Sequence, residues 1–158
     1  MTTSAAEAVR TIASAAGWRM PQETAAGEWR VLLEDGLGIR FSSPDGRTLV
    51  MHAPVGAAPE PEDERSIARI GAAAAAVARA HRSVLSITEG RLELHRRLPE
   101  AELADAGKLV KAAEGFLNEE AWWRERLSAG EASSSGPAPS PFSISGDAFE
   151  WLAGNFRI

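Results

Sequence analysis

The sequence predicts an α+β domain in which helices pack beside a twisted antiparallel sheet. Apolar residues alternate with polar ones over 29–55 and again over 84–98, and turn sequences interrupt both stretches. Helical spacing precedes, separates and follows these two stretches. The expected order of elements is α-βββ-α-ββ-α, and no internal repeat is visible.

The chain begins with one predicted helix, over 5–16. Its apolar residues recur at helical spacing, Ser4 suits the N-cap position, and Gly17 ends the helix. This short amphipathic helix is therefore expected to pack one face on the sheet.

Three strands follow and form a predicted antiparallel meander. Apolar side chains alternate over 29–33, 37–41 and 48–55. The turn sequences Glu34-Asp35-Gly36 and Pro44-Asp45-Gly46 separate the strands, because glycine adopts a positive φ at little cost.

The second half predicts a helix, a hairpin and a long helix. Acidic residues at 62–64 precede a helical stripe over 67–81, where a helix dipole favours negative charge. Short strands over 84–87 and 91–98 flank a Thr-Glu-Gly turn. The segment 100–127 has the longest helical periodicity and a broad apolar face.

Composition divides the chain into three parts. Residues 1–127 form the predicted domain, which is the usual size for one globular unit. Residues 128–141 are rich in Ser, Pro, Gly and Ala, a composition typical of a linker. Residues 142–158 form an apolar C-terminal tail. It is either an expression remnant or loosely packed extension, or a segment that folds back as a mimic of a binding partner or docks on a neighbouring dimer.

Charge and cysteine content exclude several function classes. Seventeen Lys and Arg against 22 Asp and Glu give a net charge of −5, which disfavours binding to nucleic acid and to anionic membranes. The absence of cysteine removes disulfides, thiolate metal sites and Cys nucleophiles. The N-terminus has no signal-peptide pattern, and no apolar run is long enough for membrane insertion, so we expect a cytoplasmic protein.

No motif for catalysis or for cofactor or metal binding is evident. His52, His81 and His95 lack the paired spacing of common metal sites. The Gly36-Leu37-Gly38 segment is too short for a phosphate loop, and the serines of 133–135 lack the glycines of a nucleophile elbow. We therefore predict a non-enzyme with no cofactor. An enzyme that uses His52 or His95 with a nearby carboxylate is the alternative, and it requires a concave polar pocket.

The order and character of these elements resemble a known family. The resemblance rests on four segments: 31–41 and 49–56 in the meander, 90–99 in the last hairpin arm, and 109–123 in the final helix. Through these segments, the chain resembles the class I type III secretion chaperones, the Tir chaperone-like family. The resemblance extends over about residues 1–127. The tail after Ser128 is longer and more apolar than that family usually has.

The resemblance implies a function and a set of partners. Such a chaperone binds the N-terminal segment of effector proteins in extended form and keeps it secretion-competent. The resemblance further implies a homodimer, and the ATPase of the secretion apparatus is a further candidate partner. A dimeric protein-interaction module of the same fold, outside type III secretion, is the alternative.

The same resemblance implies two interaction surfaces. An apolar client-binding groove, between the first helix and the meander, would include Ile12, Trp18, Trp29, Val31, Leu33, Ile39, Phe41, Leu49 and Met51. Apolar strand residues are more often plain core, which is the other interpretation of this set. The dimer interface would include Ile67, Ile70, Ala74, Val77, Val84, Leu85 and Ile87.

Overall fold

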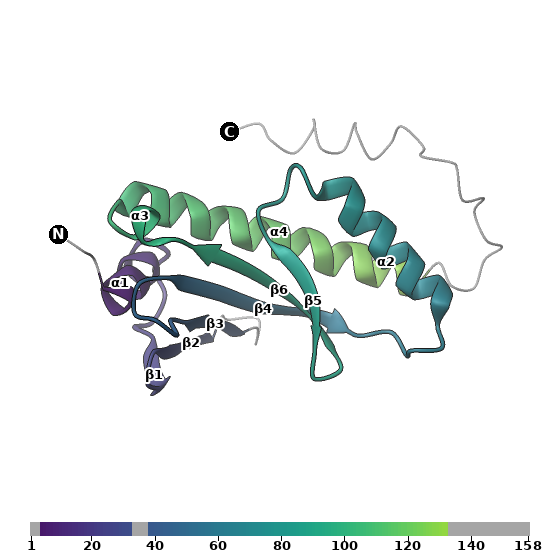
Figure 1. The fold of residues 1–158 in the computed structure, drawn as a ribbon, viewed down its shortest axis with the longest axis horizontal. Helices are drawn as coiled ribbons and strands as arrows, with labels where there is room; N and C mark the ends of the chain where they lie inside the picture. The colour runs from purple at the N-terminus through teal and green to yellow at the C-terminus, as the bar shows by residue number, and fades with distance from the viewer. Residues whose placement is uncertain (1–3, 33–37, 133–158) are drawn as a thin grey trace. The chain divides into compact units, whose positions relative to one another are not determined.

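A computed structural model describes residues 4–32 and 38–132 and confirms the predicted α+β class. Six antiparallel strands form one sheet in the order β1-β2-β3-β4-β6-β5, with helices packed beside it (Figure 1). The elements are α1 (Ala5–Ala15), β1 (Gln22–Ala25), β2 (Glu28–Leu32), β3 (Gly38–Ser42), β4 (Leu49–Ala57), α2 (Glu64–Val77), β5 (Val84–Thr88), β6 (Arg91–Leu98), α3 (Glu100–Leu103) and α4 (Ala106–Ala132).

The meander β2-β3-β4 has the predicted alternation. Trp29 pairs with Phe41, which in turn pairs with Met51, so three large apolar side chains line one face of neighbouring strands. All three are buried in the core, because successive residues of a strand point to opposite faces. The turn predicted at Glu34-Asp35-Gly36 lies outside the described residues.

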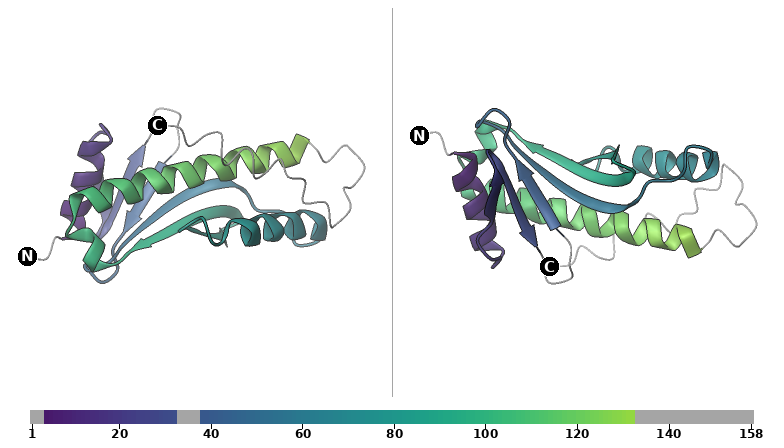
Figure 2. Two further views of the ribbon diagram at one scale, coloured as in Figure 1. Left: turned by 90° about the horizontal axis from the view of Figure 1, so that it is seen from above. Right: turned by 90° about the horizontal axis from the view of Figure 1, so that it is seen from below.

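The helices cover the core face of the sheet. The core combines side chains of α1, α2 and α4 with those of the strands. Helix α4 runs along β4 and β6, while α1 and α2 lie near opposite ends of the sheet (Figure 2). A Cβ added at Gly115 would lie 3.0 Å from Arg96 Nη1, and one at Gly56 would lie 3.2 Å from Leu127 Cδ1. Glycine therefore permits the close approach of α4 to the sheet.

Two features differ from the sequence prediction. Strand β1 was not expected, because its residues Gln-Glu-Thr-Ala show no apolar alternation and all are exposed. The long helix predicted over 100–127 is divided into α3 and α4. Asp105 lies between them, and its carboxylate accepts a hydrogen bond from the Lys108 N–H at 3.1 Å, as a helix N-cap does.

The chain divides into two compact units, residues 1–128 and residues 129–158. Helix α4 continues to Ala132, so its last residues fall within the range 128–141 predicted as a linker. The tail predicted over 142–158 lies outside the described residues. Among the helices that the structure describes, none has the length and apolar character needed to cross a bilayer.

Candidate interaction surfaces

The side chains predicted to form an apolar groove are mostly core residues. Ile12 and the predicted strand residues are buried, and the most exposed of them, Trp29, is only 8% exposed. Trp18 is half-buried and packs against the same core. Leu33 lies outside the described residues. The seven buried side chains are Ile12, Trp29, Val31, Ile39, Phe41, Leu49 and Met51, and they offer a partner almost no surface.

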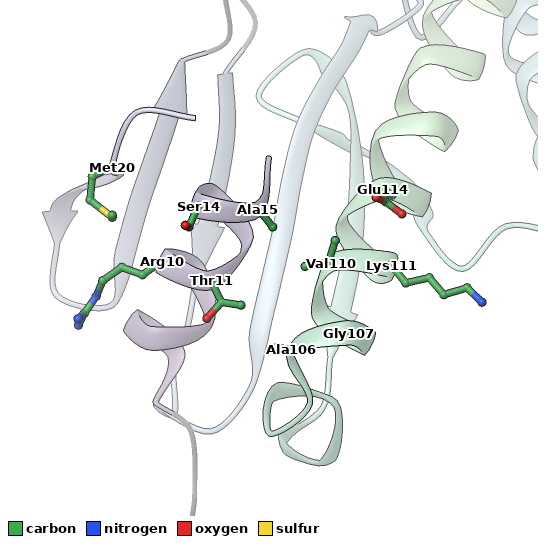
Figure 3. Close-up of a pocket in the computed structure, with 10 residues that line it drawn as sticks. All are labelled: Arg10, Thr11, Ser14, Ala15, Met20, Ala106, Gly107, Val110, Lys111 and Glu114. Atoms are coloured by element: carbon green, nitrogen blue, oxygen red, sulfur yellow. The ribbon is translucent and has the colours of Figure 1, made fainter. Parts of the chain in front are cut away.

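An open groove instead lies between α1 and the first turns of α4. It has a volume of about 900 Å³. Ala15 and Val110 lie between the two helices, as Figure 3 shows. Polar and charged groups surround this apolar floor, and the lining residues are Arg10, Thr11, Ser14, Ala15, Met20, Ala106, Gly107, Val110, Lys111 and Glu114.

Strand β1 forms one edge of the sheet. Within residues 4–32 and 38–132 its one partner strand is β2, and its register shifts between Glu23 and Ala25. Its side chains are exposed, as is that of Met20 just before it. Met20 lies at the rim of the groove, on the side of α1 away from Val110 (Figure 3), and the edge strand begins two residues later, at Gln22. An edge strand of this kind can pair with an extended peptide.

The turn that joins β1 to β2 is fixed against the meander. Gly27 has a φ of +73°, and its carbonyl accepts a hydrogen bond from the Ser43 N–H at 2.8 Å. A Cβ at this position would lie 2.7 Å from the Ser43 carbonyl oxygen. Only glycine satisfies both the backbone angle and the close approach.

The predicted dimer residues divide into two groups. Ile67, Val84 and Ile87 are 44%, 68% and 62% exposed. The other four contact the core of their own chain: Ile70, Ala74, Val77 and Leu85. Strand β5 is the second edge of the described sheet, so Val84 and Ile87 lie on an edge, whereas Ile67 lies on α2. Exposed large apolar side chains at an edge are typical of a protein interface.

The segment between α2 and β5 is held by a residue that the sequence did not reveal. Glu119, on α4, is buried, and its two carboxylate oxygens accept hydrogen bonds from the N–H groups of Arg82 and Ser83 at 2.9 and 3.0 Å. His81 packs edge-on against Trp122, with ring centroids 5.0 Å apart. Burial lowers the pKa of His81, and the Glu119 charge opposes that effect.

The sheet face opposite the core carries a polar cluster. His52 on β4 lies directly across from His95 on β6, with ring centroids 4.8 Å apart. Glu93 lies 3.3 Å from Arg40 Nη2 and 3.5 Å from His95 Nε2. Burial, assisted by Arg40 and His95 and opposed by Glu93, lowers the pKa of His52 to about 4. Cross-strand pairing thus brings together two histidines 43 residues apart, a proximity that spacing along the chain does not predict.

Several solved structures are similar to this chain. The HopA1-SchA chaperone-effector complex matches with a TM-score of 0.54 at 16% identity, over 74% of this chain and 90% of that one. The ExsC-ExsE complex matches with a TM-score of 0.57 at 15% identity, over 77% and 92%. YbjN, a candidate transcription regulator from E. coli, matches with a TM-score of 0.50 at 13% identity, over 77% and 90%. At these identities the likeness concerns the fold.

The sequence itself matches a family model. No curated protein matches the sequence closely enough to count as a relative. The model of the Tir chaperone protein (CesT) family matches residues 21–124, which include the whole sheet, α2 and most of α4. Because this match covers more than half of the chain, the chain belongs to the Tir chaperone protein (CesT) family.

Proposed function

We propose that this member of the Tir chaperone family is a type III secretion chaperone that binds the N-terminal segment of an effector protein in extended form and keeps it secretion-competent. The main support for this proposal is the open edge of β1. Met20, two residues before β1, lines the groove between α1 and α4. Two similar structures are a chaperone-effector complex and the ExsC-ExsE complex, which supports the same interpretation.

The edge and the groove supply two complementary kinds of recognition. Main-chain hydrogen bonds along β1 would hold an extended segment whatever its sequence. Apolar side chains of the same segment would then enter the groove around Ala15, Met20 and Val110. Because neither interaction requires a defined fold in the client, the site suits a segment that must stay unfolded for export.

The buried residues of the predicted groove support this surface from beneath. Trp29 belongs to the strand that pairs with β1, and Ile12 belongs to the helix that forms one wall of the groove. Their packing fixes the positions of the edge and the wall. In this proposal they act through stability, and the exposed residues beside them contact the client.

We also propose that the chain is a homodimer through α2 and β5. Ile67, Val84 and Ile87 are the exposed apolar side chains of these two elements. Burying them against a second copy would remove apolar area from water at about 25 cal/mol per Å². Val84 and Ile87 are three residues apart on β5 and therefore face opposite sides of the sheet, so a second copy would have to cover both sides of this edge. Exposed apolar side chains at an edge would otherwise favour non-specific association.

The remaining features of the proposal concern chemistry and location. A chaperone of this kind works by binding, so we expect no catalysis and no cofactor. We place the protein in the cytoplasm, with the ATPase of the secretion apparatus as a further partner. The net charge of −5 supports protein rather than nucleic-acid partners and no insertion into membranes.

A second function is a dimeric interaction module outside type III secretion. The likeness to YbjN favours it, since that structure has a similar fold and is not described as a secretion chaperone. In this case the chain forms a dimer but retains none of the effectors that are secreted with it.

Co-expression with effectors from the same secretion locus tests the proposal. We expect the N-terminal segment of an effector to co-purify with the chain. Met20→Asp and Ala15→Arg, both at exposed groove positions, should reduce the recovered effector at least about tenfold through unfavourable burial of charge. Leu32→Asp is the matched control, because Leu32 is exposed on the opposite face of β2 from the buried Val31 side chain. If all three variants recovered as much effector as the wild type, this site would be refuted. If the wild type recovered no effector, the second function would be favoured.

A further inference from the structure

Three side chains with metal-binding chemistry meet on the sheet face opposite the core. His52 and His95 are direct partners in the pairing of β4 with β6, and Glu93 lies two residues before His95 on the same face. One ring nitrogen of each histidine and one carboxylate oxygen of Glu93 all lie within 4.8 Å of one another. None of the three lines the groove of the proposed client site, whereas His95 pairs directly with Val84 of the proposed dimer surface.

We propose that His52, Glu93 and His95 form a binding site for a divalent transition-metal ion of the zinc class. Two imidazole nitrogens and one carboxylate oxygen are a ligand set that suits Zn²⁺ and neighbouring ions rather than Mg²⁺ or Ca²⁺, which prefer oxygen. Three protein ligands leave the fourth tetrahedral position for water.

Unsatisfied polar atoms in the cluster point independently to a ligand. Glu93 Oε2 and His52 Nδ1 are buried, and neither has a hydrogen-bond partner among the described residues. The contact of Oε2 with His95 Nε2, at 3.5 Å, is an ion pair only when His95 is protonated. A buried polar atom without a partner costs free energy, and such atoms are uncommon in folded proteins. Two of them in one small cluster are explained if a carboxylate oxygen and an imidazole bind an ion that removes part of this cost.

Neighbouring residues hold the three ligands in place. Arg40 Nη2 donates to Glu93 Oε1 at 3.3 Å, so Oε2 is the oxygen left for an ion. The hydroxyls of Ser42 and Ser86 lie 2.8 Å from His52 Nε2 and 2.6 Å from His95 Nε2. Contacts to the ring nitrogen that does not bind the metal orient the histidine ligands of zinc sites, so each serine has this role where its histidine binds through Nδ1. Since Ser42 is on β3 and Ser86 is on β5, four strands contribute to the arrangement.

Two adjustments accompany binding. Ligand atoms around a tetrahedral zinc ion lie about 3.3 Å apart, so the side chains must close by roughly 1.5 Å from their widest separation. If zinc binds through Nε2 of either ring, the ion displaces the serine hydroxyl there. The positive charge of Arg40 repels a bound cation. The ion pair of Arg40 with Glu93 partly neutralises that positive charge. Both changes require rotation of the three side chains, which are partly buried on this face of the sheet.

Zinc titration of the full chain, purified without a histidine tag and stripped with a chelator, tests the proposal. Calorimetry and competition with a chromophoric chelator would measure the affinity for Zn²⁺, with Mg²⁺ as a comparison ion. We expect one Zn²⁺ per chain and no comparable binding of Mg²⁺. Glu93→Gln, His52→Ala and His95→Ala should each weaken zinc binding at least about tenfold.

His81→Ala is the matched control, because His81 lies outside the cluster and packs against Trp122. It should bind zinc like the wild type. Glu93→Gln keeps the shape of the side chain and so remains informative if a histidine variant fails to fold, as judged by circular dichroism. The proposal is overturned if the wild type shows no saturable zinc binding, or if the folded Glu93→Gln variant binds as tightly as the wild type.

Discussion

The carboxylate of Glu119, on α4, accepts a hydrogen bond from the backbone N–H of Ser83 at 3.0 Å. Its other oxygen accepts one from the neighbouring Arg82 N–H at 2.9 Å. These bonds bind the segment between α2 and β5 to α4. Val84 of the proposed dimer surface follows this segment directly, so the buried carboxylate helps to position the start of β5.

Glu119→Ala should therefore destabilise the protein. The substitution leaves two backbone N–H groups without their acceptor, at a cost of about 1–3 kcal/mol, because bonds to a buried charged group are stronger than average. Urea unfolding would measure this as a lower transition midpoint. Glu119→Gln retains one acceptor oxygen but sets its NH2 donor against the other backbone N–H, so it should also lower the midpoint. An unchanged midpoint for Glu119→Ala would mean that water replaces both bonds.

Val84→Asp should convert the proposed dimer to a monomer. Val84 is 68% exposed in the single chain, so the substitution costs little in the monomer but buries a charge in the interface. Light scattering should report a mass near the 16.8 kDa of one chain, against about twice that for the wild type. Leu32→Asp, at a position of similar exposure on β2, should remain dimeric. A dimeric Val84→Asp would place the interface elsewhere.

Substitution of two methionines distinguishes a residue that contacts the client from a residue that stabilises the fold. Met51→Ala should cost about 2–5 kcal/mol of stability, because Met51 is fully buried in the core. Below its unfolding transition it should bind the client with unchanged affinity. Met20→Ala should show the reverse, with stability within about 0.5 kcal/mol of the wild type and weaker client binding. If folded Met51→Ala loses client affinity, the buried strand residues contact the client directly.

Gly27 and Gly46 offer a second matched pair. Both have a positive φ, of +73° and +68°, so alanine at either position costs about 1–2 kcal/mol. Only at Gly27 does a Cβ also meet the Ser43 carbonyl oxygen, at 2.7 Å. Thermal unfolding should therefore show a larger loss for Gly27→Ala than for Gly46→Ala. Because the clash displaces the turn that carries β1, only Gly27→Ala should also weaken client binding. If the two variants lost equal thermal stability and equal client affinity, the role of Gly27 in positioning β1 would be contradicted.

Much of the fold could be predicted from local patterns. Alternation around Trp29, Phe41 and Met51 identifies the meander, and the Asp45-Gly46 turn separates two of its strands. Strand β1 was not predicted, because its four residues have no apolar alternation. Its strand conformation depends on pairing with β2. Asp105 divides the last helical segment by capping α4, a role that periodicity alone does not reveal.

The sites were harder to predict than the fold. An apolar residue in a strand has the same pattern whether it faces a core or a client, and exposure distinguishes Val84 from Val31 only in the folded chain. The neighbouring positions of His52 and His95 depend on the register of β4 with β6, which sequence spacing does not encode. Glu119 looks like any acidic residue of an amphipathic helix until its backbone partners are known.

Amide hydrogen exchange of the chain, alone and bound to the N-terminal segment of its effector, tests the central claim most directly. Edge-strand amides exchange readily when they have no partner, and pairing with a client strand protects them. The account predicts that the client slows exchange in β1, at Gln22–Ala25, and along the groove wall of α1. Protection elsewhere on the chain, with exchange in β1 and α1 unchanged, would contradict it.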